Sequence, residues 1–229
     1  MGRPAAERRE ELIAVLKEAR GCTRCTLAMG RTQVVFGAGN ANADLMFVGE
    51  APGFHEDQQG VPFVGRAGQL LEQLLAENGM ARDDVFIANV LMCRPPGNRD
   101  PEADEIATCQ PYLMAKIELI EPSVICTLGN FATKLLSGSS AGITRVHGQP
   151  RLRELGGRVV RLYPLFHPAA ALRTPRVKEQ LREDFARLPA LLAEGAPAQP
   201  GEAPAAPPQP HRTVSEPAVD QLGLFATGS

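Results

Sequence analysis

The sequence predicts an α/β protein: a three-layer α/β/α sandwich around a central, mostly parallel sheet of four strands. Four short apolar runs, each ending in a loop, alternate with segments of helical periodicity. Strands that alternate with helices usually pair in parallel, because each helix carries the chain back to the same end of the sheet. Runs that are apolar throughout are typical of strands buried between two helical layers.

The strands are expected where apolar runs meet turn-forming residues. They are predicted at 43–50 (ADLMFVGE), 84–93 (DVFIANVLMC), 123–129 (SVICTLG) and 158–168 (RVVRLYPLFHP). In open α/β sheets ligands bind beyond the carboxyl ends of the strands. We therefore expect the chemistry along one edge, in the loops GEAPG, NVLMC, TLGN and FHPAA.

The helices are expected where apolar residues recur every three to four positions. They are predicted over 7–19, over 67–79, within 100–122, from 130 to Leu136 and over 177–192. Pro111 is expected to interrupt the third, because proline cannot donate a hydrogen bond inside a helix. One face of a single last helix is formed by Val177, Leu181, Phe185, Leu188 and Leu192.

Composition predicts a soluble, cytoplasmic protein with no membrane association. Of the 229 residues 44% are hydrophobic and 22% are charged, and no apolar run approaches the roughly 20 residues of a membrane span. The N-terminal MGRPAAERREEL lacks the apolar core of a signal peptide. Five cysteines without an export signal suit a reducing compartment, where metal binding is commoner than disulfides.

The formal net charge of −2 does not by itself indicate a nucleic-acid-binding protein. Between Arg145 and Arg187, however, ten Lys and Arg stand against four Asp and Glu, a local excess of six. This segment is either a solvated basic surface or a side that faces phosphates, and charge alone leaves both open.

Four cysteines are spaced as metal ligands could be. Cys22 and Cys25 form a C-x₂-C pair, Cys93 ends a predicted strand, and Cys109 follows on a helix after fifteen intervening residues. Four thiolates suit zinc and an iron–sulfur cluster equally, and the alternative is unrelated reduced thiols. Cys126, inside an apolar strand, is expected to be a small buried hydrophobe.

The loop GEAPGFHEDQQGVPFVGRAG is rich in glycine but contains neither GxxxxGK[ST] nor GxGxxG, which disfavours nucleotide binding. His167 stands at a strand end stiffened by Pro168. It would share the sheet edge with Glu50, Glu56, Phe63 and Asn89, and this grouping favours a functional histidine.

The motifs GEAPGFHEDQQGVPFVGRAGQLL, NVLMCRPPGNRDP and FHPAA, together with the cysteine spacing, closely resemble the family 4 uracil-DNA glycosylases of bacteria and archaea. The resemblance covers residues 8–192, in the right order. It implies a uracil-DNA glycosylase-like fold and excision of uracil from DNA. It also implies a [4Fe–4S] cluster held by Cys22, Cys25, Cys93 and Cys109.

The resemblance implies three contacts to a flipped uracil. The amide of Asn89 would read O4 and N3–H, because cytosine presents the reverse pattern and would leave buried groups unpaired. Phe63 would stack on the base. His167 would donate a hydrogen bond to O2 as negative charge develops there.

Backbone groups of Gly49, Glu50 and Ala51 would line the uracil pocket. Ala51 stands where the best-known uracil-DNA glycosylases have an aspartate, so another group must position the water. Of the nearby carboxylates Glu50, Glu56 and Asp57, we expect Glu56 to do so.

The segment after His167 is expected to meet DNA, single- or double-stranded. Leu172 would fill the gap left by the flipped base, since Ala171 is too small. Arg173 and Arg176 would neutralise phosphates.

Three regions are expected along the chain: a catalytic domain over 1–194, a disordered Pro/Ala-rich linker over 195–220, and a peptide over 221–229. QLGLF resembles the peptide by which bacterial repair proteins bind the sliding clamp. The resemblance implies clamp contacts by Gln221, Leu222, Leu224 and Phe225.

Two rival functions remain open on the sequence. One is a non-catalytic iron–sulfur protein that binds DNA or transfers electrons, and the other is a zinc-stabilised nucleotide-binding module. In either case a monomer is expected.

Overall fold

One six-stranded sheet, with strand order β1-β3-β2-β4-β6-β5, runs through the computed structural model, which describes residues 3–200. Its four inner strands are β2 (Leu45–Gly49), β3 (Phe86–Asn89), β4 (Val124–Leu128) and β6 (Arg158–Leu165). All neighbouring pairs among these four are parallel. The predicted parallel sheet of four strands is therefore confirmed.

Two antiparallel edge strands were missed by the sequence analysis. They are β1 (Ala38–Gly39), beside β3, and β5 (Arg151–Leu155), beside β6. The side chains of β5 are almost all exposed, so it lacks the apolar run by which strands were identified. A signal was present in Gly156 and Gly157, which both have positive φ (57° and 73°) and close the β5–β6 hairpin.

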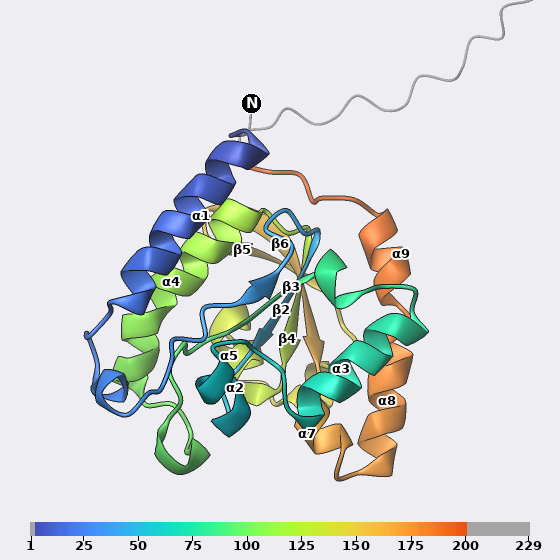
Figure 1. Cartoon of the computed structure of the whole chain (residues 1–229). Coiled ribbons are helices and arrows are strands. Elements are labelled where there is room, and N and C mark those ends of the chain that lie inside the picture. Colours follow the sequence, from blue (N-terminus) through green and yellow to red (C-terminus); the bar gives the residue numbers. More distant parts are fainter. Residues whose placement is uncertain (1–2, 201–229) are drawn as a thin grey trace, which may run out of the picture.

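Helices cover both faces of the sheet (Figure 1). Their bounds are α1 Ala5–Arg20, α2 Phe54–Gln59, α3 Arg66–Glu77, α4 Ala103–Ile120, α5 Asn130–Ser137, α6 Ile143–Val146, α7 Pro168–Ala171, α8 Pro175–Phe185 and α9 Leu188–Ala193. Short 3₁₀ helices occupy Thr26–Met29, Arg82–Asp84 and Pro96–Asn98.

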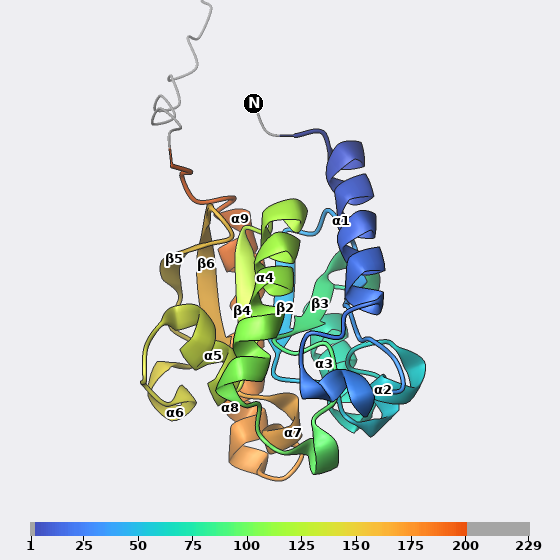
Figure 2. The ribbon, with the colours of Figure 1, turned by 90° about the vertical axis from the view of Figure 1, so that its left-hand side faces the viewer.

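The two faces carry separate hydrophobic cores, as a three-layer sandwich requires. On one face Leu113 of α4 packs in a group with Met46 of β2. On the other, Leu71 of α3 lies in the group in which Phe47 stacks on Phe185 of α8, with 5.7 Å between ring centroids. Figure 2 shows α1 and α4 on the side of the sheet away from α3.

The predicted interruption at Pro111 is wrong, because α4 runs through it. Proline has no N–H, so the carbonyl of Ala107 loses its usual helical partner. The helix continues because Cys109 and Leu113, on either side, are anchored in the core. Tertiary packing outweighs the local preference here.

The single last helix is also wrong. α8 ends at Phe185 and α9 begins at Leu188, with Pro189 in its first turn. A proline at 189 cannot donate to the carbonyl of Phe185 and its ring would collide with it. Leu188 nevertheless stays buried and Leu192 packs against the same core, which explains the apolar periodicity across the break.

The packed chain extends past the predicted domain end at 194. The Gln199 side chain donates to the Val159 carbonyl (2.9 Å) and accepts from its N–H (3.0 Å). This segment lies at the end of the sheet opposite the carboxyl ends of the parallel strands (Figures 1 and 2). The rest of the predicted linker and the peptide 221–229 lie outside the described residues. No helix within residues 3–200 is long and apolar enough to cross a membrane.

Candidate active site

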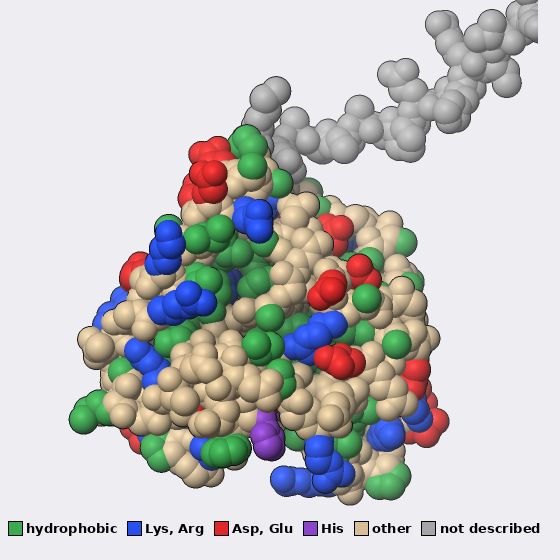
Figure 3. Space-filling view, viewed as in Figure 1, with side chains coloured by type: hydrophobic (Ala, Val, Ile, Leu, Met, Phe, Trp, Pro, Cys, Tyr) green, Lys and Arg blue, Asp and Glu red, His purple; other side chains and the backbone are tan. Residues whose placement is uncertain are grey.

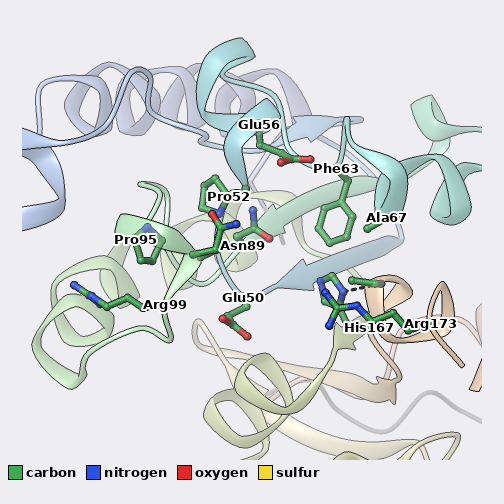
Figure 4. Close-up of a pocket in the computed structure, with 14 residues that line it drawn as sticks. Glu50, Pro52, Glu56, Phe63, Ala67, Asn89, Pro95, Arg99, His167 and Arg173 are labelled. Atoms are coloured by element: carbon green, nitrogen blue, oxygen red, sulfur yellow. Dashed lines mark hydrogen bonds between the residues drawn. The ribbon is translucent and has the colours of Figure 1, made fainter.

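A cavity of about 490 Å³ opens where the parallel strands end (Figure 4). The loops after β2, β3 and β6 supply most of its lining. The lining residues are Glu50, Ala51, Pro52, Gly53, Glu56, Phe63, Ala67, Asn89, Pro95, Asn98, Arg99, His167, Ala169 and Arg173. The structure thus brings together, in one cavity, most of the residues that the sequence analysis placed along this edge.

Asn89 lies at the floor of this cavity. It pairs in register with Gly49 on the neighbouring strand and is only 2% exposed. Within residues 3–200 its side-chain amide makes no hydrogen bond to protein, although its neighbours Val90 and Leu91 donate to the carbonyls of Gly49 and Glu50. Because Asn89 lines the cavity and its amide makes no contact of this kind with the described residues, the amide is available to a polar ligand there.

Gly49 is needed for this arrangement. A Cβ added to Gly49 would lie 2.9 Å from the Phe63 ring and closer still to Oδ1 of Asn89. Any side chain at this position would displace the amide or the ring.

Phe63 has a strained backbone, with φ of 55°, and is 6% exposed. A phenylalanine with positive φ persists only where its surroundings hold it. Arg82 does so by donating to the carbonyls of Pro62 and Phe63, and Gly68 leaves room for the latter. Arg82 was not predicted as a site residue, because no local pattern distinguishes it from other arginines.

His167 faces the cavity as a neutral hydrogen-bond donor. Its Nδ1 accepts from the backbone N–H of Ala169 (3.1 Å), so the proton of the neutral ring lies on Nε2. Burial lowers the pKa of His167 to about 4, although the Glu56 carboxylate opposes the shift. Its ring centroid lies 5.7 Å from that of Phe63.

The three carboxylates considered for water positioning differ in their partners. Oε1 of Glu56 accepts from the N–H groups of Val64 (3.0 Å) and Gly65 (2.9 Å), which ties α2 to the start of α3. Glu50 lines the cavity, and burial together with the charge of Asp100 raises its pKa. Asp57 is buried outside the cavity and accepts from the Thr32 N–H (3.0 Å).

Arginines gather at the rim beside α7. Arg173 lines the cavity, Arg176 is exposed, and Leu172, which is 38% exposed, does not line the cavity. Figure 3 shows Lys and Arg side chains gathered at this lower edge of the molecule. Arg99 lines the opposite part of the cavity, bound to Glu105 through two hydrogen bonds (2.6 and 2.9 Å), and was also missed.

The basic excess of residues 145–187 is divided between two places. Arg158 and Arg161 lie at the start of β6, where they pair with Glu121 (3.4 Å) and Glu194 (2.9 Å). Arg173 and Arg176 lie at the other end of the sheet. Only part of the excess can therefore face a ligand in the cavity.

The four spaced cysteines pack in one part of the core. Burial raises the pKa of Cys93 and Cys109, and the charges of neighbouring cysteines add to it. Burial opposes ionisation of Cys22 too, but hydrogen bonds from Arg24 and Tyr112 hold its pKa below the ordinary value. Cys126 is fully buried in β4, as predicted.

The donor set suits an iron–sulfur cluster. Arg31 donates to Sγ of Cys93 (3.4 Å), and hydrogen bonds to sulfur are a common way to tune such clusters. Four cysteine thiolates are also a donor set of structural zinc sites. Within residues 3–200 no group of three or more His, Cys, Asp or Glu side chains is placed to hold a metal ion.

Comparison with known proteins agrees with this geometry. Residues 36–188 match the family model of the uracil DNA glycosylase superfamily. The type-4 uracil-DNA glycosylase of Thermotoga maritima is 48% identical over 167 residues, which cover 72% of this chain and 85% of the relative. Those of Sulfurisphaera tokodaii (44% over 184 residues; 78% and 84% covered) and Archaeoglobus fulgidus (41% over 192 residues; 82% and 96% covered) are similar too. The chain therefore belongs to the uracil-DNA glycosylase superfamily, within its type-4 group.

Proposed function

We propose that this protein hydrolyses the bond between uracil and C1′ of deoxyribose in DNA, releasing free uracil and leaving an abasic site for base excision repair. The observation that carries the proposal is the pairing, in one cavity, of the unpartnered Asn89 amide with the neutral donor His167. Incubation with a uracil-containing oligonucleotide, followed by alkaline cleavage of the abasic strand, tests it. A cytosine-containing strand is the control, and intact uracil-containing DNA would refute the proposal.

Recognition begins when the nucleotide leaves the helix, at a free-energy cost of a few kcal/mol that is least for a mispaired base. The Asn89 amide then accepts from N3–H of uracil and donates to O4. Cytosine has an acceptor at N3 and a donor amino group at N4, so the oxygen of the Asn89 amide would face an acceptor and its NH₂ group would face a donor. Both pairs would be left without a hydrogen bond. The Phe63 ring packs on the base, a contact worth roughly 1–3 kcal/mol.

Bond cleavage places negative charge on N1 and O2 of the departing base while the sugar becomes an oxocarbenium-like cation. Nε2–H of His167 donates to O2 as this charge grows. Because Nδ1 is held by the Ala169 N–H, the ring is oriented before the reaction and need not reorganise. Glu50 and Ala51, whose backbone groups are expected to contact the base, line the same cavity.

Glu56 positions the attacking water in this proposal, in addition to holding its loop. Glu56→Gln keeps an oxygen that can accept from Val64 and Gly65 but removes the charge. We expect kcat to fall by about tenfold, with an unchanged melting temperature. Glu56→Ala should lower both, because it also frees the two N–H groups.

Steady-state kinetics and thermal unfolding of the two Glu56 variants make this test. A Glu56→Gln enzyme as fast as the wild type would exclude the Glu56 carboxylate from the chemistry. Glu50→Gln is the variant to compare with Glu56→Gln, because Glu50 is the other carboxylate that lines the cavity.

A [4Fe–4S] cluster held by Cys22, Cys25, Cys93 and Cys109 is part of the proposal. When bound it would cross-link the end of α1, the loop after β3 and α4, and metal binding of this kind contributes folding free energy. Its place in the core, outside the catalytic cavity, supports a structural role.

Cys93→Ala should abolish the broad absorbance at roughly 400 nm and lower the melting temperature by several degrees. Cys126→Ala is the control, because that thiol is equally buried but lies in β4. It should keep the absorbance. Equal absorbance of the Cys93→Ala protein would contradict the ligand assignment.

The peptide 221–229 is proposed to bind the sliding clamp through Gln221, Leu222, Leu224 and Phe225. The described chain reaches Pro200 at the end of the sheet opposite the cavity, so a partner of the tail need not block the site (Figure 1). Deleting 221–229 should abolish binding to immobilised clamp and leave uracil release unchanged. If the protein without 221–229 binds the clamp as well as the full chain does, the peptide is not the clamp-binding segment. Monomeric state and cytoplasmic location stay predictions from the sequence.

A further inference from the structure

Phe54 is an exposed aromatic residue at the mouth of the catalytic cavity. It begins α2 directly after Pro52 and Gly53, which line the cavity, and 53% of its surface is accessible. Every other phenylalanine within residues 3–200 is buried or partly buried. An isolated exposed apolar residue needs no explanation by itself, but this one is next to a site that receives a base.

Arg94 holds the Phe54 ring from one side. Its guanidinium carbon lies 5.3 Å from the ring centroid, within range of a cation–π contact. Arg94 is itself fixed, since its Nε donates to Oδ1 of Asn98 (2.7 Å). Asn98 and Pro95 line the cavity, so the pair is attached to the rim.

This rim lies across the cavity from the arginines near α7. In Figure 4, Pro52 and Pro95 stand on one side of Asn89, and Arg173 stands on the other beside His167. With uracil in the cavity, one neighbouring nucleotide would lie on the Pro52 side, where Phe54 begins α2, and the other on the side of Arg173.

We propose that Phe54, braced by Arg94, is a stacking platform for the base next to the flipped uracil, on the side of the cavity opposite Leu172. This rests on the proposed function, because it requires a nucleotide in the cavity. The neighbouring base loses a stacking partner when uracil leaves the helix, and the half-exposed Phe54 ring replaces it. Stacks of a base on an aromatic side chain change affinity by roughly 5- to 150-fold.

The platform should matter most for single-stranded DNA. A base in a single strand is free to turn onto the ring, whereas a base in a duplex is held by its own pair. Phe54 should therefore increase the affinity of the enzyme for single-stranded DNA more than its affinity for duplex DNA.

A double-mutant cycle tests the contact directly. The dissociation constant is measured for single-stranded oligonucleotides that carry 2′-fluorodeoxyuridine, whose glycosidic bond resists cleavage. The neighbouring nucleotide, 5′ in one series and 3′ in the other, is either a normal base or an abasic spacer. The proteins are wild type, Phe54→Leu, Phe54→Trp and, as a control, Leu152→Ala, an exposed apolar side chain on β5.

Removing the neighbouring base should weaken wild-type binding by roughly 5- to 150-fold in one of the two series. For DNA with the normal neighbouring base, Phe54→Leu should weaken binding by the same factor. The affinity of this variant should then not change when the neighbouring base is replaced by the abasic spacer. Phe54→Trp and Leu152→Ala should behave as the wild type. If Phe54→Leu and the abasic spacer each weaken binding by independent factors in both series, Phe54 does not contact the neighbouring base and the proposal is refuted.

The test of the platform can be distinguished from the test of the proposed function. Binding needs no cleavage, so a Phe54-dependent coupling would support the platform whatever the rate of uracil release. Release of uracil by the wild type without any coupling would refute the platform alone.

Discussion

Replacing His167 with alanine should lower kcat for uracil release by about 10²–10³-fold and change the affinity for uracil-containing DNA by only a few-fold. The expectation follows from where charge develops. O2 of uracil is a weak acceptor in the ground state and an anionic one in the transition state. A donor already oriented by the Ala169 N–H therefore stabilises the transition state selectively.

Single-turnover kinetics measure this effect, with filter or anisotropy binding for affinity. His55→Ala is the matched control, because His55 is exposed and does not line the cavity. It should retain a rate within a few-fold of the wild type. An equal loss in both variants would mean that His167 acts only through general stability.

The pH profile gives a second, independent check on His167. Its pKa is lowered to about 4 by burial, so the neutral ring is the form present from pH 8 down to about 5. We expect kcat/KM to be flat over that range and to fall near pH 4, where protonation of Nδ1 breaks its bond with Ala169. A fall centred near 6.5, the usual histidine pKa, would contradict the lowered pKa, and a rate that rises as the ring is protonated would contradict a neutral donor.

The same shift links pH to stability. The unfolded chain binds a proton at His167 near pH 6.5, and the folded chain does so only near 4. Between these values the unfolded state binds more protons, so the free energy of unfolding decreases as pH falls from 6.5 toward 4. The His167→Ala protein should lose this part of the pH dependence.

Replacing Asn89 with alanine should lower kcat/KM by about 10²–10³-fold, because N3–H and O4 of the bound uracil would both lose their partner. The melting temperature should change little. The amide has no hydrogen-bond partner within residues 3–200, so its removal breaks no hydrogen bond of the folded protein.

Asn78→Ala should show the opposite pattern. The Asn78 side chain donates to the Leu74 carbonyl at the end of α3 (2.8 Å), far from the cavity lining. Its loss should lower the melting temperature and spare activity. If Asn89→Ala instead destabilised the protein and kept its kcat/KM, Asn89 would be a structural residue.

Much of the fold followed from local patterns. Each inner strand is an apolar run that ends in a loop, and the direction of parallel strands then brings Asn89 and His167 to one edge. The exposed strand β5 escaped this reasoning because charged residues separate its two leucines and it has no apolar run. Pro111 and Pro189 show that the same residue type can be tolerated or disruptive, and the surrounding packing decides which.

The sequence by itself determined the α/β class, the edge that carries the site, and the residue types available there for reading a base and stabilising its anion. Only the tertiary structure decided how those groups are prepared. It revealed that Gly49 leaves room for the Asn89 amide, that Arg82 holds Phe63 at positive φ, and that the Ala169 N–H fixes the His167 tautomer. The reason is physical. Periodicity reports which side of an element faces the core, whereas burial, close approach and hydrogen bonds between separate loops arise only once the elements have packed.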